Sequence, residues 1–355
     1  MTFIPETNFK TNIMKKLIYL FLTVLIVGCS SEDNNNDGNN NNQSSCPIYL
    51  DSNGVTIKAC DDANVGDTGV IDGVTYTVVD EAMLRNMVGN GEDVTKAVTT
   101  KVTDMSDLFF LDNGAISDFN QPIGNWDVSN VTDMSYMFAN NYLFNQNISY
   151  WDVSNVIDMS WIFVYAYSFN QPIGDWDVSN VTDMSDMFST AEAFNQPIDN
   201  WNTGNVTAMV RMFYRAINFN QPIGSWDVSN VTDMTNLFFE NTSFNQPIGG
   251  WDVSSVTDMT QMFFRSSFNQ PIGDWDVSNV RDMLNMFNQT ESFNQPIDNW
   301  DVSNVNRMFR MFSSAIAFNQ DISSWNVNNV NDCSFFSDNT PQWTLPQPNF
   351  TNCTP

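Results

Sequence analysis

A phrase of about 25 residues recurs nine times along this chain. The first copy reads FNQPIGNWDVSNVTDMSYMF and runs from Phe119 to Phe138. Successive copies begin 25 residues apart, except for one interval of 24 between Phe244 and Phe268, where a residue is missing near Ser266. A fixed period of this length is the sequence signature of a stack of similar structural units, each covering the next.

Within one copy the pattern predicts a short strand followed by a short helix. Residues 126–128 alternate apolar and polar side chains, as in a strand. The apolar positions between Val131 and Phe138 then recur at i, i+3, i+6 and i+7, which is one face of a two-turn helix. Asp133 falls in the first turn of that helix, where a negative charge suits the helix dipole, and Pro122 excludes a helix from the returning segment.

We therefore expect an α/β repeat solenoid of about nine coils, with one short parallel strand and one short helix in each coil. Columns of Trp, Phe, Met, Val and Ile should fill its interior, because one unit cannot bury its apolar side chains alone. The Asn of each Phe-Asn-Gln, such as Asn120 and Asn145, should point inward and bond the backbone of the next coil.

The two ends of the array differ from the repeats in composition. Residues 46–98 contain a predicted strand at 71–79 and a predicted helix from Glu81 to Val88, capped by Asp80. We assign 46–98 as an N-terminal cap, 99–332 as the repeat solenoid and 333–355 as a C-terminal cap, since repeat arrays need polar ends to stay soluble.

The beginning of the chain has the pattern of an export signal. Two lysines after Met14 precede an apolar run that ends at Val27, so we expect residues 1–28 to be a signal peptide, with Met14 as the true start. Residues 26–29 resemble the lipobox of bacterial lipoproteins, which implies that Cys29 is acylated and becomes the first mature residue. An uncleaved anchor, or a plain signal with a chance Cys, is the alternative.

Residues 29–45 follow as an Asn-rich tether that cannot bury a core. Acidic residues just after Cys29 resemble the surface-export signal of Bacteroidetes lipoproteins. The expected location is therefore the cell outer membrane, lipid-anchored and surface-exposed, with a periplasmic position as the alternative. The membrane is contacted through the lipid only.

Four further cysteines allow three disulfide pairings in an exported chain. Asn53-Gly54 is a strong hairpin signal and would bring Cys46 nearly opposite Cys60. This leaves Cys333, which occupies a core Met position of the last repeat, to pair with Cys353. Neither pair has the spacing of a metal site.

Charge and composition exclude several classes of function. The chain has a formal net charge of −28 and no His. Such a surface repels phosphates, so we expect no nucleic-acid partner. Without His, Ser-His-Asp and Cys-His catalysis and His-ligated zinc are impossible. We therefore expect no enzymatic activity and no cofactor.

The motifs FNQPI, WDVSNVTDMS and the following MF resemble the BspA-like leucine-rich-repeat surface proteins of Bacteroidetes, mycoplasmas and Listeria. The resemblance covers residues from about 99 to 336. It implies an exported, surface-attached solenoid of a kind that binds host matrix proteins or other bacteria. Met, Phe, Trp and Val stand where ordinary leucine-rich repeats have Leu, so the usual curvature is not implied.

Two columns of Asp repeat along the array. The first contains Asp127, Asp152, Asp177, Asp227, Asp252, Asp276 and Asp301, and the second contains Asp133, Asp158, Asp183, Asp233, Asp258, Asp282 and Asp332. Calcium would relieve the repulsion between stacked carboxylates. The alternative, which we favour, is that the first column bonds turn amides and the second caps helices.

The positions that vary between copies follow each Met-Phe pair, and any specificity should reside there. Arg and aromatic residues gather at these positions, and such residues dominate binding hot spots. The ligand-binding candidates are Tyr142, Trp161, Tyr165, Tyr167, Arg211, Tyr214, Arg215, Phe239, Phe264 and Arg265. Opposite charges on neighbouring copies, such as Asp186 and Arg211, also permit plain inter-coil salt bridges.

The sequence thus predicts a non-enzymatic binding or adhesion lipoprotein that recognises an extracellular protein or glycan through variable residues of one solenoid face. The alternative is a structural or assembly component of the cell envelope. A carbohydrate-active enzyme would need a pair of Asp outside the repeating columns, and none is evident.

Overall fold

The computed structural model describes residues 47–111 and 116–355. The predicted signal peptide, Cys29, the tether and Cys46 lie outside these residues. The compact unit Cys46–Pro355 is described here by itself. Within its described residues, no helix has the length and apolar character needed to cross a lipid bilayer.

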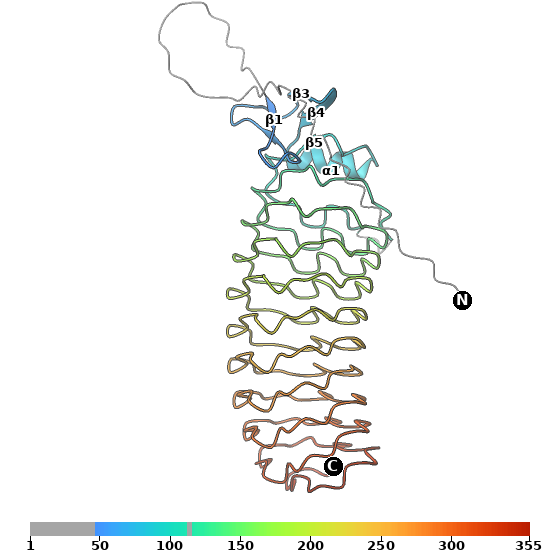
Figure 1. The fold of residues 1–355 in the computed structure, drawn as a ribbon, viewed down its shortest axis with the longest axis vertical. Coiled ribbons are helices and arrows are strands. Elements are labelled where there is room, and N and C mark those ends of the chain that lie inside the picture. Colours follow the sequence, from blue (N-terminus) through green and yellow to red (C-terminus); the bar gives the residue numbers. More distant parts are fainter. Residues whose placement is uncertain (1–46, 112–115) are drawn as a thin grey trace, which may run out of the picture. The chain divides into compact units, whose positions relative to one another are not determined.

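The N-terminal part of this unit contains its regular secondary structure (Figure 1). The elements are β1 (Ile48–Leu50), β2 (Ile57–Ala59), β3 (Thr68–Ile71), β4 (Val74–Val78), α1 (Glu81–Gly89) and β5 (Ala97–Val98). Strands β1 and β2 form the antiparallel hairpin predicted around Asn53-Gly54. A second sheet has the order β3-β4-β5, with β3 antiparallel and β5 parallel to β4.

The local predictions for this part are confirmed with one correction. Helix α1 begins after Asp80, whose carboxylate accepts a hydrogen bond from Met83 N at 2.8 Å. The single strand predicted over 71–79 is wrong. Asp72 and Gly73 both adopt positive φ, so this Asp-Gly pair makes a tight turn and divides the segment into β3 and β4.

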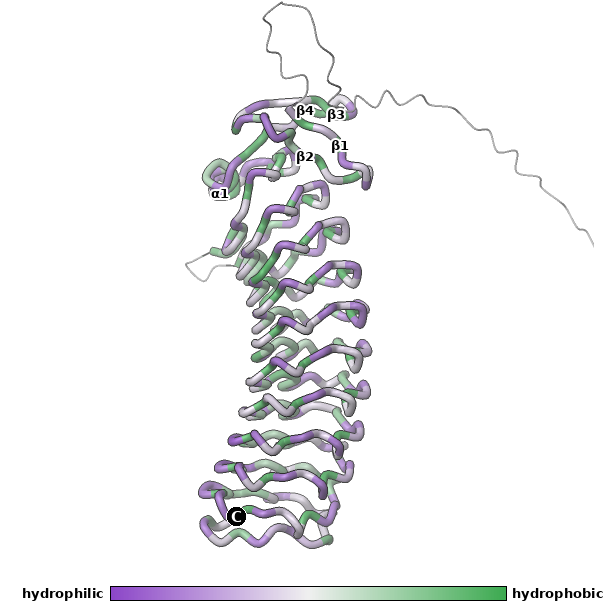
Figure 2. Tube along the Cα trace, turned by 90° about the vertical axis from the view of Figure 1, so that its left-hand side faces the viewer, coloured by the Kyte–Doolittle hydropathy of each residue, from purple (hydrophilic) through white to green (hydrophobic). Residues whose placement is uncertain are grey.

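Below α1 the chain winds into stacked coils, with the C-terminus at the opposite end of the stack from β1–β5 (Figure 1). One continuous hydrophobic core runs from Val79 to Trp343, and hydrophobic segments recur at the same place in successive coils (Figure 2). Leu84 of α1 joins this core, so α1 covers the first coil. The repeat solenoid predicted from the sequence is therefore confirmed.

The predicted strand and helix within each coil are wrong. Between residues 116 and 355 the described chain contains turns and isolated parallel bridges instead. The bridges join equivalent residues of neighbouring coils, as in Asp133 to Asp158 and Asp158 to Asp183. Trp126-Asp127-Val128, the expected strand, forms no bridge.

Backbone hydrogen bonding explains why the apolar spacing did not produce a helix. Phe138 N donates to Ile162 O of the next coil at 3.0 Å, whereas Met137 N turns back to Met134 O of its own coil at 3.2 Å. Amides along this segment alternate between the two kinds of partner. A helix would direct all of them inside one coil and leave nothing to join the coils, so the stack favours the alternating backbone.

This alternation requires a left-handed residue at two positions in each coil, four residues apart. The positions with φ between 50° and 60° include Tyr136, Asn140, Trp161, Tyr165, Asp186, Thr190, Arg211, Arg215, Asn236, Glu240, Gln261, Arg265, Asn285, Gln289, Arg310, Ser314, Phe335 and Asn339. Left-handed backbone costs an L residue other than Gly or Asn roughly 1–2 kcal/mol. The variable columns predicted from the sequence occupy these strained positions.

A pair of glycine substitutions tests this strain. Ser314→Gly should raise the free energy of unfolding by a few tenths of a kcal/mol, because the relief of left-handed strain exceeds the entropic cost of glycine, about 0.5–1 kcal/mol. Ser324 is exposed and has no positive φ. Ser324→Gly should therefore destabilise by about 0.5–1 kcal/mol. Urea denaturation compares the two, and a loss in both variants would contradict the strain argument.

Side-chain ladders join the coils on the other faces. Each Trp in the repeat donates its indole N–H to a backbone carbonyl one coil away, as Trp176 does to Ile148 O at 3.2 Å. Asn145 Oδ1 accepts from Asn170 N at 3.0 Å and from Gln171 Nε2 at 2.8 Å. The predicted bond to the next coil is confirmed, but Asn145 is exposed and does not point inward.

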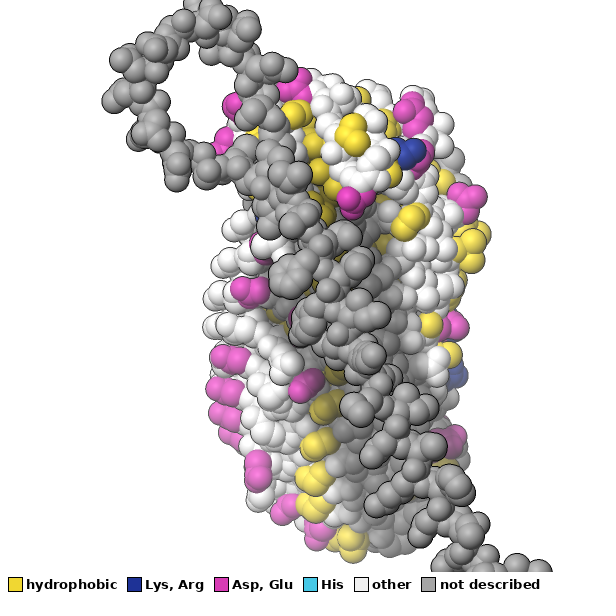
Figure 3. Space-filling view, turned by 45° about the horizontal axis from the view of Figure 1, so that its top comes forward, with side chains coloured by type: hydrophobic (Ala, Val, Ile, Leu, Met, Phe, Trp, Pro, Cys, Tyr) yellow, Lys and Arg dark blue, Asp and Glu magenta, His cyan; other side chains and the backbone are white. Residues whose placement is uncertain are grey.

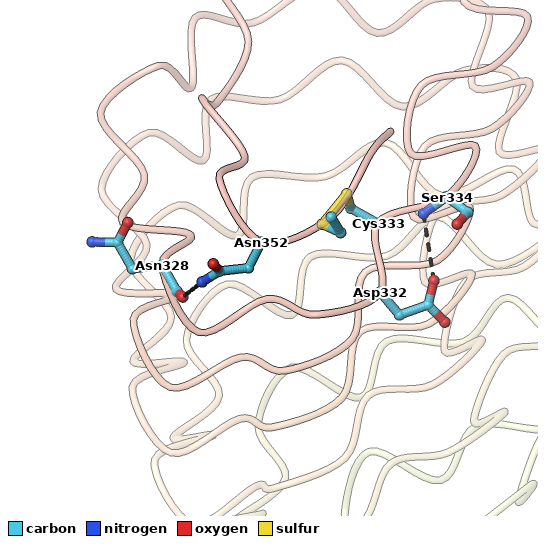
Figure 4. The surroundings of a disulfide bond; sticks show 6 residues. Asn328, Asp332, Cys333, Ser334 and Asn352 are labelled. Atoms are coloured by element: carbon cyan, nitrogen blue, oxygen red, sulfur yellow. Dashed lines mark hydrogen bonds between the residues drawn. A yellow bond between two sulfur atoms is a disulfide. The ribbon is translucent and has the colours of Figure 1, made fainter.

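The C-terminal end is closed by a disulfide between Cys333 and Cys353, whose Cα atoms lie 5.8 Å apart, as predicted (Figure 4). Cys333 is fully buried at the Met position of the last repeat. Trp343 packs on Phe318 edge-to-face at 4.7 Å and covers the last coil. The pairing of Cys60 with Cys46 stays a prediction, because Cys46 lies outside the described residues.

Candidate functional site

The left-handed positions give the solenoid one irregular surface. We call it the turn face and define it as positions 136, 139 and 140 of the first coil together with their equivalents in the following coils. Exposure at these positions depends on the residue: Ala139 and Val164 are buried, whereas Tyr165 is 39% exposed. Residues 134, 137 and 138 of the same segment are fully buried. The larger turn-face side chains therefore lie outside the apolar columns that form the core.

Eight of the ten predicted binding residues lie on the turn face. Trp161 and Arg211 are equivalent to position 136; Tyr214, Phe239 and Phe264 to 139; and Tyr165, Arg215 and Arg265 to 140. Tyr142 and Tyr167 lie two residues further along their coils and contact each other edge-to-face at 4.6 Å. Tyr167 also contacts Tyr165, at 6.2 Å between ring centroids, so the structure brings the predicted residues into one neighbourhood.

A shallow depression of about 450 Å³ lies within the turn face. Its lining includes Trp161, Tyr165, Asp186, Arg211, Tyr214 and Phe239. Five of these six are predicted binding residues, and Asp186 is the addition. The sequence identifies Asp186 only as a charge partner of Arg211 in the same variable column, and not as a binding residue.

The predicted contact between Asp186 and Arg211 is confirmed as a two-pronged ion pair. Arg211 Nε lies 2.9 Å from both carboxylate oxygens, and a second guanidinium nitrogen lies 2.8 Å from Asp186 Oδ2. Burial raises the pKa of Asp186, and the hydrogen bonds and charge of Arg211 oppose that shift. The Asp186 side chain is only 3% exposed, so Arg211 supplies the opposite charge that a carboxylate buried in the depression needs.

A second group of ion pairs lies on the turn face besides the pair of Asp186 and Arg211. Glu240 accepts from Arg215 Nε at 3.2 Å and from an Arg265 terminal nitrogen at 2.9 Å, on either side of it in the stack. Arg265 Nε also donates to Gln289 Oε1 at 2.8 Å. Both arginine side chains are about half exposed. Exposed pairs of this kind contribute little stability, about 0–1 kcal/mol each.

Aromatic rings of the turn face stack along the solenoid axis. Tyr136 lies parallel to Trp161, with ring centroids 5.2 Å apart and planes 6° apart. Tyr214, Phe239 and Phe264 form a second stack with centroid spacings of 4.6 Å. The sequence located these residues, but it could not show that they contact each other face to face.

The missing residue near Ser266 leaves a polar notch beside the turn face. A pocket of about 370 Å³ is lined by Arg265, Ser266, Ser267, Gln289 and Glu291, among others. Arg265 belongs to both surfaces, so the notch extends the turn face.

The two Asp columns bond local turn groups. In the first column, Asp227 Oδ1 accepts from Ser229 N at 3.0 Å and Ser229 Oγ at 2.7 Å. In the second, Asp133 Oδ1 accepts in the same way from Ser135. The turn role of the first column is confirmed, and helix capping by the second is wrong because no helix follows. Acidic side chains line up along the coils on the face in Figure 3, yet the described residues contain no cluster of three or more metal-binding side chains.

These turn bonds predict an acid-sensitive stack. Hydrogen bonds from the following serine lower the pKa of Asp177, Asp227, Asp252 and Asp301. A carboxyl group whose pKa is lowered in the folded state stabilises the fold at pH values above its unfolded pKa of about 3.9. This stabilisation is lost as the pH falls through the pKa of the folded state. Asp186, with its raised pKa, opposes this trend.

We therefore expect the free energy of unfolding to fall below pH 4, measured by urea denaturation between pH 5 and pH 2. Replacing Ser179, Ser229, Ser254 and Ser303 by Ala removes the hydroxyl donors and should flatten this fall. An equal slope in the variant would contradict the assignment.

Comparison with known families gives one match. A family model described as "Mycoplasma protein of unknown function, DUF285" matches residues 79–198, 171–267 and 248–344, more than half of the chain. The three overlapping matches cover the tandem repeats. No curated protein and no solved structure matches the chain.

Proposed function

The chain belongs to the DUF285 family, whose description leaves the function open, and we propose that it is a non-enzymatic surface-displayed binding or adhesion lipoprotein. It recognises an extracellular protein or glycan through the turn face. In finer classification, it is a BspA-like leucine-rich-repeat protein, a proposal that rests on the motifs FNQPI and WDVSNVTDMS.

The observation that supports this proposal best is the gathering of varied Arg and aromatic side chains at strained positions. Trp161 and Tyr165 have φ of 60° and 57°, where bulky residues are rare. Asn occupies equivalent positions at Asn140 and Asn236 and tolerates this backbone at lower cost. Because stability alone favours Asn or Gly there, the retained Trp, Tyr and Arg are better explained by binding.

The proposed location at the outer surface of the cell envelope rests on the sequence. The lipobox-like residues 26–29 and the acidic residues after Cys29 support a lipid-anchored, exported chain. The Asn-rich tether would hold the solenoid away from the membrane, where its turn face can meet a partner.

A structural role in the envelope is the second candidate. The ion pairs of the turn face join neighbouring coils, as Glu240 does with Arg215 and Arg265, so part of this surface serves the stack itself. The aromatic-lined depression favours binding, because a scaffold alone gains nothing from half-exposed rings such as Tyr165, which is 39% exposed.

The test is a glycan and matrix-protein array probed with the purified full chain and with a variant carrying Ala at Trp161, Tyr165 and Arg211. We expect at least one ligand to bind the unchanged chain and to lose binding at least tenfold with the variant. Running the array with calcium and with a chelator tests the Asp columns separately. If the triple variant binds every ligand as well as the unchanged chain does, recognition does not use the turn face.

A further inference from the structure

The stacked rings of the turn face have few open faces. One face of Trp161 is covered by Tyr136 at 5.2 Å, and Arg211 lies 5.2 Å from the ring centroid of Trp161. Phe239 lies between Tyr214 and Phe264, 4.6 Å from each. These rings therefore present mainly their edges to solvent.

Ring edges and ring faces attract different ligands. An aromatic face is electron-rich and its edge is electron-poor. A neutral sugar stacks by laying its C–H groups on an open face, and the faces of Trp161 and Phe239 are occupied. An edge instead attracts carboxylate and carbonyl oxygens, and it packs edge-to-face against a ring of the partner. At Trp161 and Phe239 the geometry therefore favours a polypeptide over a neutral glycan.

The turn face is far less acidic than the chain as a whole. Arg215 and Arg265, each about half exposed, share the single carboxylate of Glu240. The Arg211 charge is matched by Asp186. Three guanidinium groups thus meet two carboxylates on the turn face, and Glu291 lies with Arg265 in the adjoining notch, so this surface is close to neutral on a chain whose formal net charge is −28. An acidic partner is repelled by most of the chain's surface and can be paired at the turn face.

From these observations we infer that the turn face between Trp161 and Arg265 binds an acidic polypeptide segment that carries aromatic side chains. The acidic groups pair with Arg215 and Arg265, and a partner ring packs into the depression bounded by Tyr165 and Tyr214. The inference rests on the proposed function and names the partner class of the same surface.

The experiment is a selection of displayed random peptides on the purified full chain, followed by affinity measurement with a synthetic copy of the most frequent peptide. Selected peptides should be rich in Asp or Glu and in Tyr, Trp or Phe. Changing the Glu and Asp of that peptide to Gln and Asn should weaken binding roughly tenfold, which is about 1.4 kcal/mol, since charge-assisted hydrogen bonds to the arginines are lost.

Three variants of the chain should change the affinity for the acidic peptide in different directions. Arg265→Gln should weaken binding of the acidic peptide, whereas Glu240→Gln should strengthen it because the competing carboxylate is removed. Arg281→Gln makes the same charge change at an exposed arginine away from the turn face and should leave affinity unchanged. Thermal unfolding of each variant confirms that it is folded.

The outcomes separate this inference from the proposed function. If the selected peptides are basic, if no peptide exceeds background, or if only neutral glycans bind through the turn face, the partner class is wrong while the function stands. If only a second copy of the chain binds there, both proposals fail in favour of the assembly role. If ligands bind but no turn-face variant changes their affinity, both proposals fail.

Discussion

Replacing Phe188 by alanine is expected to lower the free energy of unfolding by about 3–5 kcal/mol. Phe188 is fully buried in the middle of the stack. Its ring lies 3.9 Å from Phe194 in the same coil and 5.8 Å from Phe213 in the next. Deleting the ring leaves a cavity that stacked neighbours on both sides cannot collapse to fill, because ladders of backbone hydrogen bonds fix the coil spacing.

Urea denaturation followed by tryptophan fluorescence measures this loss. Tyr150→Ala is the matched control, since Tyr150 is 51% exposed and should change stability by less than about 0.5 kcal/mol. Equal losses in the two variants would show that the aromatic columns do not form the core that holds the coils together.

Removing the terminal disulfide should have the second largest effect. Cys353→Ser opens a loop of 20 residues in sequence separation, and a loop of this size is expected to contribute about 3 kcal/mol. Cys353 is the better position to change, because Cys333 is fully buried. This substitution leaves Cys60 and Cys46 untouched, which reduction would not.

The loss of stability should be confined to the C-terminal coils. In a stack each coil contacts only its neighbours, so opening the C-terminal end frays the last coils first. Hydrogen exchange should accelerate at Phe312 and Phe336, whose amide groups lie in the last bridged coils, and stay unchanged at Phe163. Equal acceleration along the whole array would mean that the disulfide stabilises the stack globally.

The repeat itself was predictable from the sequence because period and burial are linked. A constant apolar side chain in every copy has to lie in a column, and Phe144, Trp151 and Met159 are all buried as expected. The course of the backbone within one coil was not predictable in this way. A spacing of i, i+3, i+6 and i+7 also satisfies a chain of alternating turns, and only the bonds between coils decide between the two.

The candidate site was predictable in part for a similar reason. Variation among otherwise constant copies identified Trp161, Tyr165 and Arg211 without any structure. The sequence did not show that Asp186 is buried beneath Arg211, or that the rings cover one another, because both depend on the direction of side chains at left-handed residues. The buried ion pair and the stacked rings are the two features from which we infer the class of ligand.

The most direct test replaces the side chains of the turn face and leaves the core unchanged. Asn tolerates the left-handed backbone, so it can replace the left-handed residues without added strain. The variant carries Asn at Tyr136, Trp161, Tyr165, Asp186, Arg211, Arg215, Glu240 and Arg265. Its cooperative unfolding transition and its affinity for the best ligand of the unchanged chain are then measured together. We predict a folded stack that has lost binding. A folded stack that still binds with unchanged affinity would contradict the claim that the constant residues of the repeat build the scaffold and the variable residues recognise the partner.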